Sequence, residues 1–103
     1  MDPKLQEIVA RLVRAYAPER IYLFGSATSG TTGPNSDYDL LVIVADDAPP
    51  ERRRSSLAYE ALRGTGIAAD VIVQARSYFE GRRHVRTSIA ATVDREGQLL
   101  HVA

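Results

Sequence analysis

Two aspartates one residue apart, Asp37 and Asp39, stand at the start of an apolar run that continues to Val44. Side chains alternate along a strand, so both carboxylates are expected on one face, with their Cα atoms roughly 6–7 Å apart. Carboxylates at that separation can bridge two hard cations held about 3.5–4 Å apart, as in two-metal phosphoryl-transfer sites. Magnesium prefers such oxygen ligands and shares them with substrate phosphates. The pair therefore predicts a site for metal ions and phosphate.

A phosphate-binding turn is predicted about a dozen residues upstream of this pair. Gly25 and Ser26 directly follow a short apolar run, at a point where a strand would pass into one or two helical turns. Backbone N–H groups at the start of a helix point outward and favour an anion. Gly25 would let a phosphate approach the backbone, and the Ser26 hydroxyl would add a donor.

A third carboxylate is predicted at the same place by the segment AADVIVQ. Asp70 stands there among apolar neighbours, where a charged group needs a physical reason. Asp37 and Asp39 would hold both metal ions, while Asp70 would complete one metal site and help to deprotonate an attacking hydroxyl. Three carboxylates opposite a phosphate site predict a nucleotidyl-transfer centre.

Each of these residues also has an ordinary structural explanation. Asp37 and Asp39 could cap a strand or pair with an arginine, Ser26 could be a plain helix cap, and Asp70 could be a strand-end aspartate. The combined spacing of the glycine, the serine and the paired aspartates favours the metal-and-phosphate interpretation over these alternatives.

The first half of the chain supplies the elements that would position the site. A helix is expected from Pro3, with Asp2 as its cap and Pro18 at its end. Its apolar side chains recur at helical spacing: Leu5, Ile8, Val9, Leu12, Val13 and Tyr16. Strands are expected over 20–24 and 37–44, and the second is apolar on both faces, which indicates a central strand.

The second half is expected to alternate helices and strands. We expect a helix over 51–63, a strand over 67–74, a short helical segment, a helix over 83–96 and a strand over 98–102. Ser77 and Glu80 fit a capping box for the short segment, and Gly81 is expected to break it. Val85 is expected on the inward face of the following helix. The predicted fold class is α/β or α+β, with helices packed on a small mixed sheet.

Size and composition limit the functions that the chain could perform. Its 103 residues suit one domain spanning 1–103. The formal net charge is zero, which argues against coating of long nucleic acid. There is no cysteine, so no disulfide or thiolate zinc site is possible. The charged amphipathic N-terminus and the short apolar runs predict a cytoplasmic protein that does not cross a membrane.

The pattern Gly25-Ser26, Gly30 and Ser36-Asp37-Tyr38-Asp39 resembles the signature of the DNA polymerase beta-like nucleotidyltransferase superfamily. The chain length is similar to that of its minimal nucleotidyltransferase (MNT) branch, and the resemblance extends from Ile21 to Val73. It implies a nucleotidyltransferase fold, and phosphate or nucleotide contacts from the four glycine and serine positions Gly25, Ser26, Gly30 and Ser36. It also implies that the three aspartates are metal ligands and catalytic residues: Asp37, Asp39 and Asp70.

The same resemblance implies an activity and a partner. Members transfer a nucleoside monophosphate from a nucleoside triphosphate to a hydroxyl, using two magnesium ions, and ATP is the donor expected here. Many minimal members form an antitoxin–toxin pair with a helical HEPN protein, and some add AMP to a tyrosine of that ribonuclease toxin. The expected partners are therefore a HEPN-type toxin and a nucleoside triphosphate, with homo- or hetero-oligomers possible.

One departure from the family pattern keeps other functions open. Family members often carry arginines after Gly-Ser, where this chain has Ala27, Thr28 and Ser29. A catalytically weak or inactive module that neutralises its partner by binding alone is one alternative. A small-molecule nucleotidyltransferase of the aminoglycoside-modifying kind is another, although a chain this short leaves little to enclose such an acceptor.

Overall fold

Residues 3–25 and 38–103 are described by a computed structural model, and within them four strands form one mixed sheet in the order β3-β2-β1-β4. The strands are β1 (Arg20–Phe24), β2 (Tyr38–Val44), β3 (Ala69–Ala75) and β4 (Gln98–Val102). β1 is antiparallel to β2 and to β4, whereas β2 and β3 are parallel. The prediction that β2 is a central strand is confirmed.

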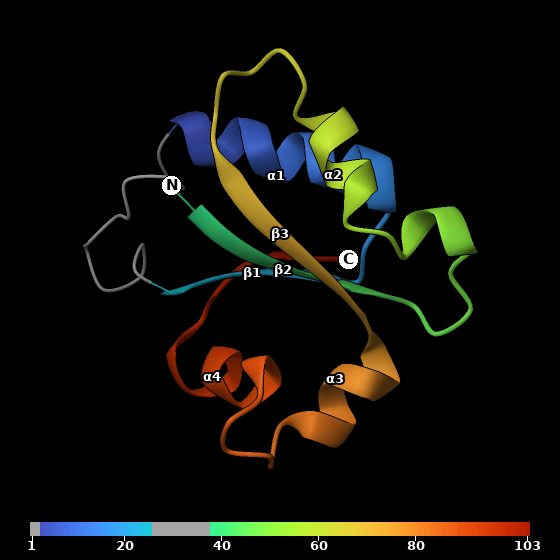
Figure 1. Cartoon of the computed structure of the whole chain (residues 1–103), viewed down its shortest axis with the longest axis vertical. Helices are drawn as coiled ribbons and strands as arrows, with labels where there is room; N and C mark the ends of the chain where they lie inside the picture. The colour runs from blue at the N-terminus through green and yellow to red at the C-terminus, as the bar shows by residue number, and fades with distance from the viewer. Residues whose placement is uncertain (1–2, 26–37) are drawn as a thin grey trace.

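Helices cover both faces of this sheet (Figure 1). Helices α1 (Pro3–Tyr16) and α2 (Ser56–Ala61) lie on one face, and α3 (Arg76–Arg82) and α4 (Ile89–Glu96) lie on the other. α2 belongs to the crossover that any parallel pair such as β2 and β3 requires. The α/β fold class and the mixed sheet are therefore as predicted.

Alternation along the strands divides the apolar side chains between two cores. On β2, Leu40, Val42 and Val44 face α1 and α2, whereas Leu41 and Ile43 face α3 and α4. The first core includes the apolar stripe of α1, of which Ile8 and Leu12 are fully buried. In the second core Phe79 stacks on Tyr22 with ring centroids 5.7 Å apart. Burial on both faces explains why β2 is apolar at every position after Asp39.

The helix predicted over 51–63 is wrong in its first half. Residues Pro50–Arg52 form a 3-10 turn, and α2 begins only at Ser56. The segment 51–54 has no apolar side chain to anchor a helix on the sheet. Instead the Arg53 side chain donates hydrogen bonds to the carbonyl oxygens of Ala48 and Asp46, which hold this segment as a turn.

The two helices after β3 also differ from their predictions. α3 continues through Gly81, and its first residues use no capping box, because the Asp46 carboxylate from another loop accepts the Ser77 backbone N–H at 2.9 Å. The last helix starts at Ile89 and not at residue 83. Ser88 caps it by accepting the Ala91 N–H at 3.0 Å, and Val85 is left 37% exposed.

Two further observations concern the remaining segments. The expected cap Asp2 and the expected helical turns over 26–30 lie outside the described residues. No helix within the described ranges is both long enough and apolar enough to span a bilayer.

Candidate functional site

Asp39 and Asp70 lie side by side at the beginnings of the two parallel strands. The register of β2 and β3 pairs Asp39 with Asp70, and neighbouring strands are about 4.8 Å apart. Asp39 alternates with Leu40, which faces α1, so its carboxylate lies on the face that also carries α3 and α4. Asp70 shares that face because its strand is in register. Two segments thirty-one residues apart in the sequence thus bring their carboxylates together.

Gly25 closes the site on the other side of Asp39. It follows Phe24, which pairs with Asp39 across the antiparallel β1–β2 register. Gly25 has φ +76°, a conformation that residues with a Cβ rarely adopt. A Cβ at this position would lie only 3.2 Å from Asp39 Cγ and would collide with its carboxylate oxygen. The glycine is therefore needed for the Asp39 carboxylate to sit against the end of β1.

The electrostatics of the pair are those of two close negative charges. Asp39 is half-buried, and this burial raises the pKa of its carboxyl above the ordinary value. The neighbouring Asp70 carboxylate raises that pKa further by repulsion. An arrangement of this kind is relieved by a cation placed between the two groups.

No side chain of the protein provides that cation within the described residues. All 13 lysines and arginines of the chain lie in 3–25 and 38–103. The ion pairs in these ranges are Arg11–Glu7, Arg76–Glu19 and Arg83–Asp94. Neither Asp39 nor Asp70 takes part in one. The alternative in which Asp39 pairs with an arginine therefore has no support among the described residues, and for Asp37, which lies outside them, it stays open.

The remaining predicted site residues fall outside what the structure describes. Ser26, Gly30, Ser36 and Asp37 all belong to the segment 26–37, so their predicted roles stay predictions. Among the described residues no group of three acidic or histidine side chains is gathered that could hold a metal ion. The structure thus brings together Gly25, Asp39 and Asp70, and the remaining predicted carboxylate, Asp37, is two residues before Asp39 in the sequence.

A pocket beside Asp70 was not anticipated from the sequence. It has a volume of about 340 Å³ and is lined by Tyr59, Leu62, Ile67, Ala68, Ala69 and Asp70. Its walls come from α2 and from the segment leading into β3. No local sequence pattern predicts that these two segments lie next to each other. The residue that could have indicated this pocket is Tyr59, a large aromatic side chain on the polar side of α2. It is 68% exposed.

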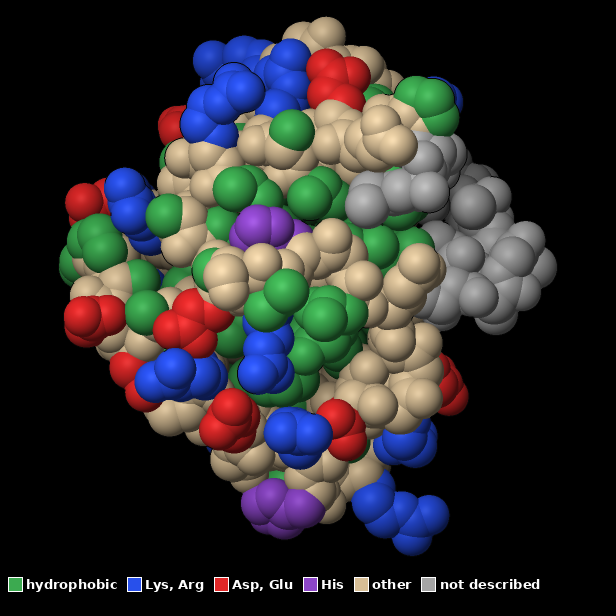
Figure 2. Space-filling view, turned by 180° about the vertical axis from the view of Figure 1, so that it is seen from behind, with side chains coloured by type: hydrophobic (Ala, Val, Ile, Leu, Met, Phe, Trp, Pro, Cys, Tyr) green, Lys and Arg blue, Asp and Glu red, His purple; other side chains and the backbone are tan. Residues whose placement is uncertain are grey.

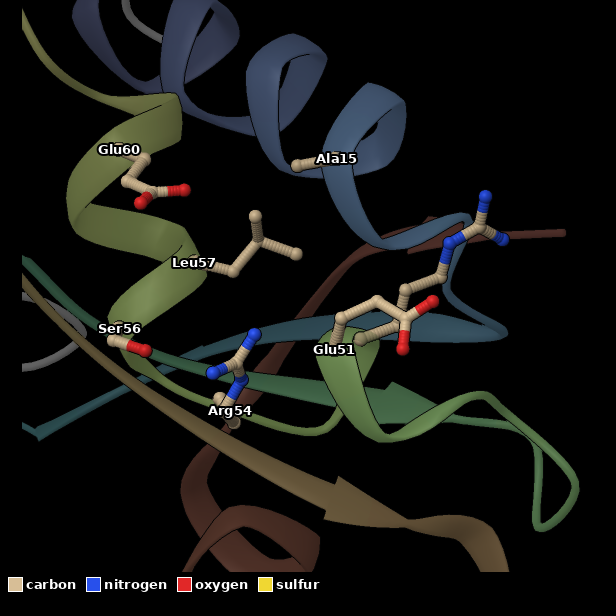
Figure 3. A pocket seen from close by; sticks show the side chains of 7 residues that line it. Ala15, Glu51, Arg54, Ser56, Leu57 and Glu60 are labelled. Carbon is tan, nitrogen blue, oxygen red and sulfur yellow. The ribbon is translucent and has the colours of Figure 1, made fainter.

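A second pocket, of about 290 Å³, lies away from the carboxylates, between α1, the 3-10 turn and α2 (Figure 3). Acidic and basic side chains both line it, among them Glu51, Arg54 and Glu60. It belongs to the side of the sheet that carries α1 and α2, opposite to the face of Asp39. We therefore do not assign the nucleotide to it.

Comparison with known proteins found a matching family model and similar solved structures. The model of the nucleotidyltransferase domain family matches residues 3–94. The crystal structure of a toxin–antitoxin with AMP-PNP is similar, with a TM-score of 0.59 and 25% identity over 95% of this chain and 73% of that chain. A mutant of the toxin–antitoxin MntA-HpeT gives a TM-score of 0.60 at 22% identity, covering 99% of this chain and 75% of that chain.

A comparison with curated proteins gave no match. The family model covers nearly the whole chain. The chain therefore belongs to the nucleotidyltransferase domain family.

Proposed function

We propose that the protein is a magnesium-dependent adenylyltransferase that moves AMP from ATP to a hydroxyl of a partner protein. The observation that carries this proposal is the pairing of Asp39 with Asp70 on one face of the sheet, where neither forms an ion pair with a lysine or arginine among the described residues. The similarity to a toxin–antitoxin with AMP-PNP supports an adenine nucleotide as donor and a toxin as the acceptor protein.

The donor set fits magnesium. Two carboxylates in register supply hard oxygen ligands. Burial raises the pKa of Asp39, repulsion by Asp70 raises it further, and a divalent cation would remove the repulsion. Asp39 and Asp70, with Asp37 as the predicted third ligand, would hold the metal. When bound, magnesium would neutralise charge on the phosphates and on the attacking oxygen.

The protein's own groups would orient and deprotonate the acceptor. The hydroxyl oxygen forms a bond to the α-phosphorus of ATP, its proton passes to the Asp70 carboxylate, and the bond from the α-phosphorus to the bridging oxygen breaks to release pyrophosphate. The backbone at Gly25, with Ser26, Gly30 and Ser36 as predicted contacts, would hold the phosphates.

We further propose that the acceptor is a helical toxin of the HEPN type, encoded beside this protein, and that the pair acts in the cytoplasm. Addition of AMP to a tyrosine of this toxin would silence it. In this role the protein is the antitoxin, and its acceptor domain is supplied by the partner.

Intact mass spectrometry of the neighbouring gene's product tests this function. The product is incubated with the protein, ATP and magnesium, and the Asp37→Ala/Asp39→Ala variant is the control. We expect added mass in AMP units with the wild type and none with the variant. A stable complex without added mass would reject the transferase and support neutralisation by binding alone. Protection against an aminoglycoside in a growth assay would instead indicate a small-molecule acceptor.

A further inference from the structure

The outer edge of β3 is open. β3 is an end strand of the sheet formed by the described residues, and it pairs only with β2. Alternate residues of such a strand point their N–H and C=O groups away from the sheet. Natural proteins protect an edge of this kind with charges, prolines or bulges. β3 (ADVIVQA) has a single charged residue, Asp70, at its beginning and no proline.

Two separate hollows lie beside this edge, one on each face of the sheet, and we call the edge together with these hollows the groove. The pocket beside Asp70 lies at its beginning. A second hollow, of about 390 Å³, is lined by Ile72, Val73, Gln74, Ala75 and Tyr78 toward its end. Two exposed tyrosines mark the ends of this groove, Tyr59 at 68% and Tyr78 at 49% exposure. Asp70 lines the first hollow, so the edge begins beside the residue that would deprotonate the acceptor.

An unpartnered acceptor atom lies beside the groove. The side-chain oxygen Oε1 of Gln74 is buried and has no hydrogen-bond partner in the part of the chain that the structure describes. A buried amide oxygen without a donor is uncommon, because leaving it unpaired costs about 1–3 kcal/mol. Hydrogen-bonding capacity next to the hollow at the end of β3 is therefore unused among the described residues.

We infer that the free edge of β3 is the docking site for an extended segment of the acceptor protein, with the acceptor hydroxyl delivered at Asp70. This inference rests on the proposed function and names the surface that selects its substrate. Backbone pairing would hold the segment, and the two hollows would receive its alternate side chains.

The charges at the groove favour a polypeptide over a nucleic acid. None of the residues that line the two hollows is basic, and the one charged residue among them is acidic. The guanidinium of Arg82 lies 4.6 Å from the ring centroid of Tyr78, at the far end. Pairing with a second copy of this chain would cover Asp70 and exclude the acceptor, which is why the acceptor is the occupant we assign.

Hydrogen–deuterium exchange of the protein, with and without the neighbouring gene's product, tests the docking site. We expect slower exchange of the amides of 69–75 when that product is added. Slower exchange confined to α1, to the 3-10 turn or to α4 would overturn the inference. Concentration-dependent protection of β3 by the protein alone would assign the edge to a second copy and would overturn it too.

Two substitutions in the groove refine this test. Ala68→Trp fills the pocket beside Asp70 without adding a charge, and Tyr78→Ala removes the aromatic at the distal end. We expect each to raise the half-saturating concentration of the acceptor by about tenfold, as for interface residues of this size, with the affinity for AMP-PNP unchanged. Ala10→Trp, at an exposed position of α1, is the matched control and should match the wild type. Equal acceptor saturation in all four proteins would overturn the docking site.

The outcomes also separate this inference from the proposed function. Protection of β3 without transfer of AMP to the product would reject the transferase and leave the docking edge in place. Transfer of AMP without protection of β3 would support the transferase and reject the docking edge.

Discussion

At the scale of single residues, the contact between Gly25 and Asp39 determines whether the site can form. The glycine has a positive φ and also lies against the carboxylate, so two separate physical requirements act at one position. Gly64 offers a natural comparison, because its φ is +86° but nothing lies within 4 Å of a Cβ built there. Substitutions at the two glycines therefore distinguish the effect of backbone strain from the effect of damage to the site.

We therefore predict different outcomes for Gly25→Ala and Gly64→Ala. Both substitutions should lower the free energy of unfolding by about 1–2 kcal/mol through backbone strain, measured by urea denaturation. Gly25→Ala should also displace the Asp39 carboxylate and reduce AMP transfer by about a hundredfold. Gly64→Ala should transfer AMP at the wild-type rate. Similar transfer rates for the two variants would contradict the role assigned to Gly25.

At the scale of secondary-structure elements, α3 depends on a residue far from it in the sequence. Its first turn is capped by the Asp46 carboxylate, which lies in the loop after β2. The hydrogen bond from the Ser77 backbone N–H is the main cause that lowers the pKa of Asp46 below 3.8, with smaller effects from Arg76 and Arg53. This cap helps to hold the helix whose Phe79 fills the second core.

The cap predicts a pH dependence of stability. A lowered folded-state pKa means that Asp46 stabilises the protein fully above its ordinary value of 3.8 and loses this effect as the pH falls through the lower folded value. The Asp46→Ala variant should therefore melt at a lower temperature than the wild type at pH 7. This difference in melting temperature should disappear as the pH falls toward the acidic end of the range. Thermal unfolding followed by circular dichroism between pH 7 and pH 2 measures this.

Asp47→Ala is the matched control for this prediction. Asp47 is the next residue along the chain, is exposed, and makes no hydrogen bond to α3 in the described structure. Its replacement should leave the melting temperature unchanged over the same pH range. An equal loss in both variants would mean that general surface charge, and not the cap, is responsible.

At the scale of the whole molecule, the net charge is zero, but charged and apolar side chains are distributed unevenly over the surface. Figure 2 shows acidic and basic side chains interspersed around a band of apolar ones on the face seen from behind. The edge strand β3 carries the apolar groove and Asp70, which is paired in register with Asp39 of β2. Neither carboxylate forms an ion pair within the described residues. A surface without excess positive charge is suited to a protein partner and to one nucleotide held by metal ions.

Ligand binding should therefore stabilise the whole molecule only when metal and nucleotide are present together. AMP-PNP with magnesium at 100 times its dissociation constant should add about 2.7 kcal/mol, which raises the melting temperature of a domain this size by about 10 °C or more. Removal of magnesium with EDTA should abolish the shift, measured by differential scanning fluorimetry. Asp39→Asn should show little shift under either condition. A full shift in EDTA would contradict the metal site.

The sequence by itself determined the elements with strong periodicity and the residue types of the site. Local spacing, which a single sequence displays directly, indicated the apolar stripe of α1 and the central position of β2. It also showed a glycine turn followed a dozen residues later by two aspartates. Helix boundaries at 51–55 and 83–88 were wrong because side-chain hydrogen bonds, which the spacing of apolar residues does not show, set them. Arg53 stabilises a turn there, and Ser88 starts α4 later than expected.

Only the tertiary structure decided which groups meet. Four features join segments that are distant in the sequence: the register that pairs Asp39 with Asp70, the approach of Gly25 to Asp39, the cap from Asp46 and the groove along β3. Such contacts depend on strand pairing and crossover geometry, which no local pattern encodes. The chemistry of the site is therefore readable in the residues, whereas its assembly and its access are properties of the fold.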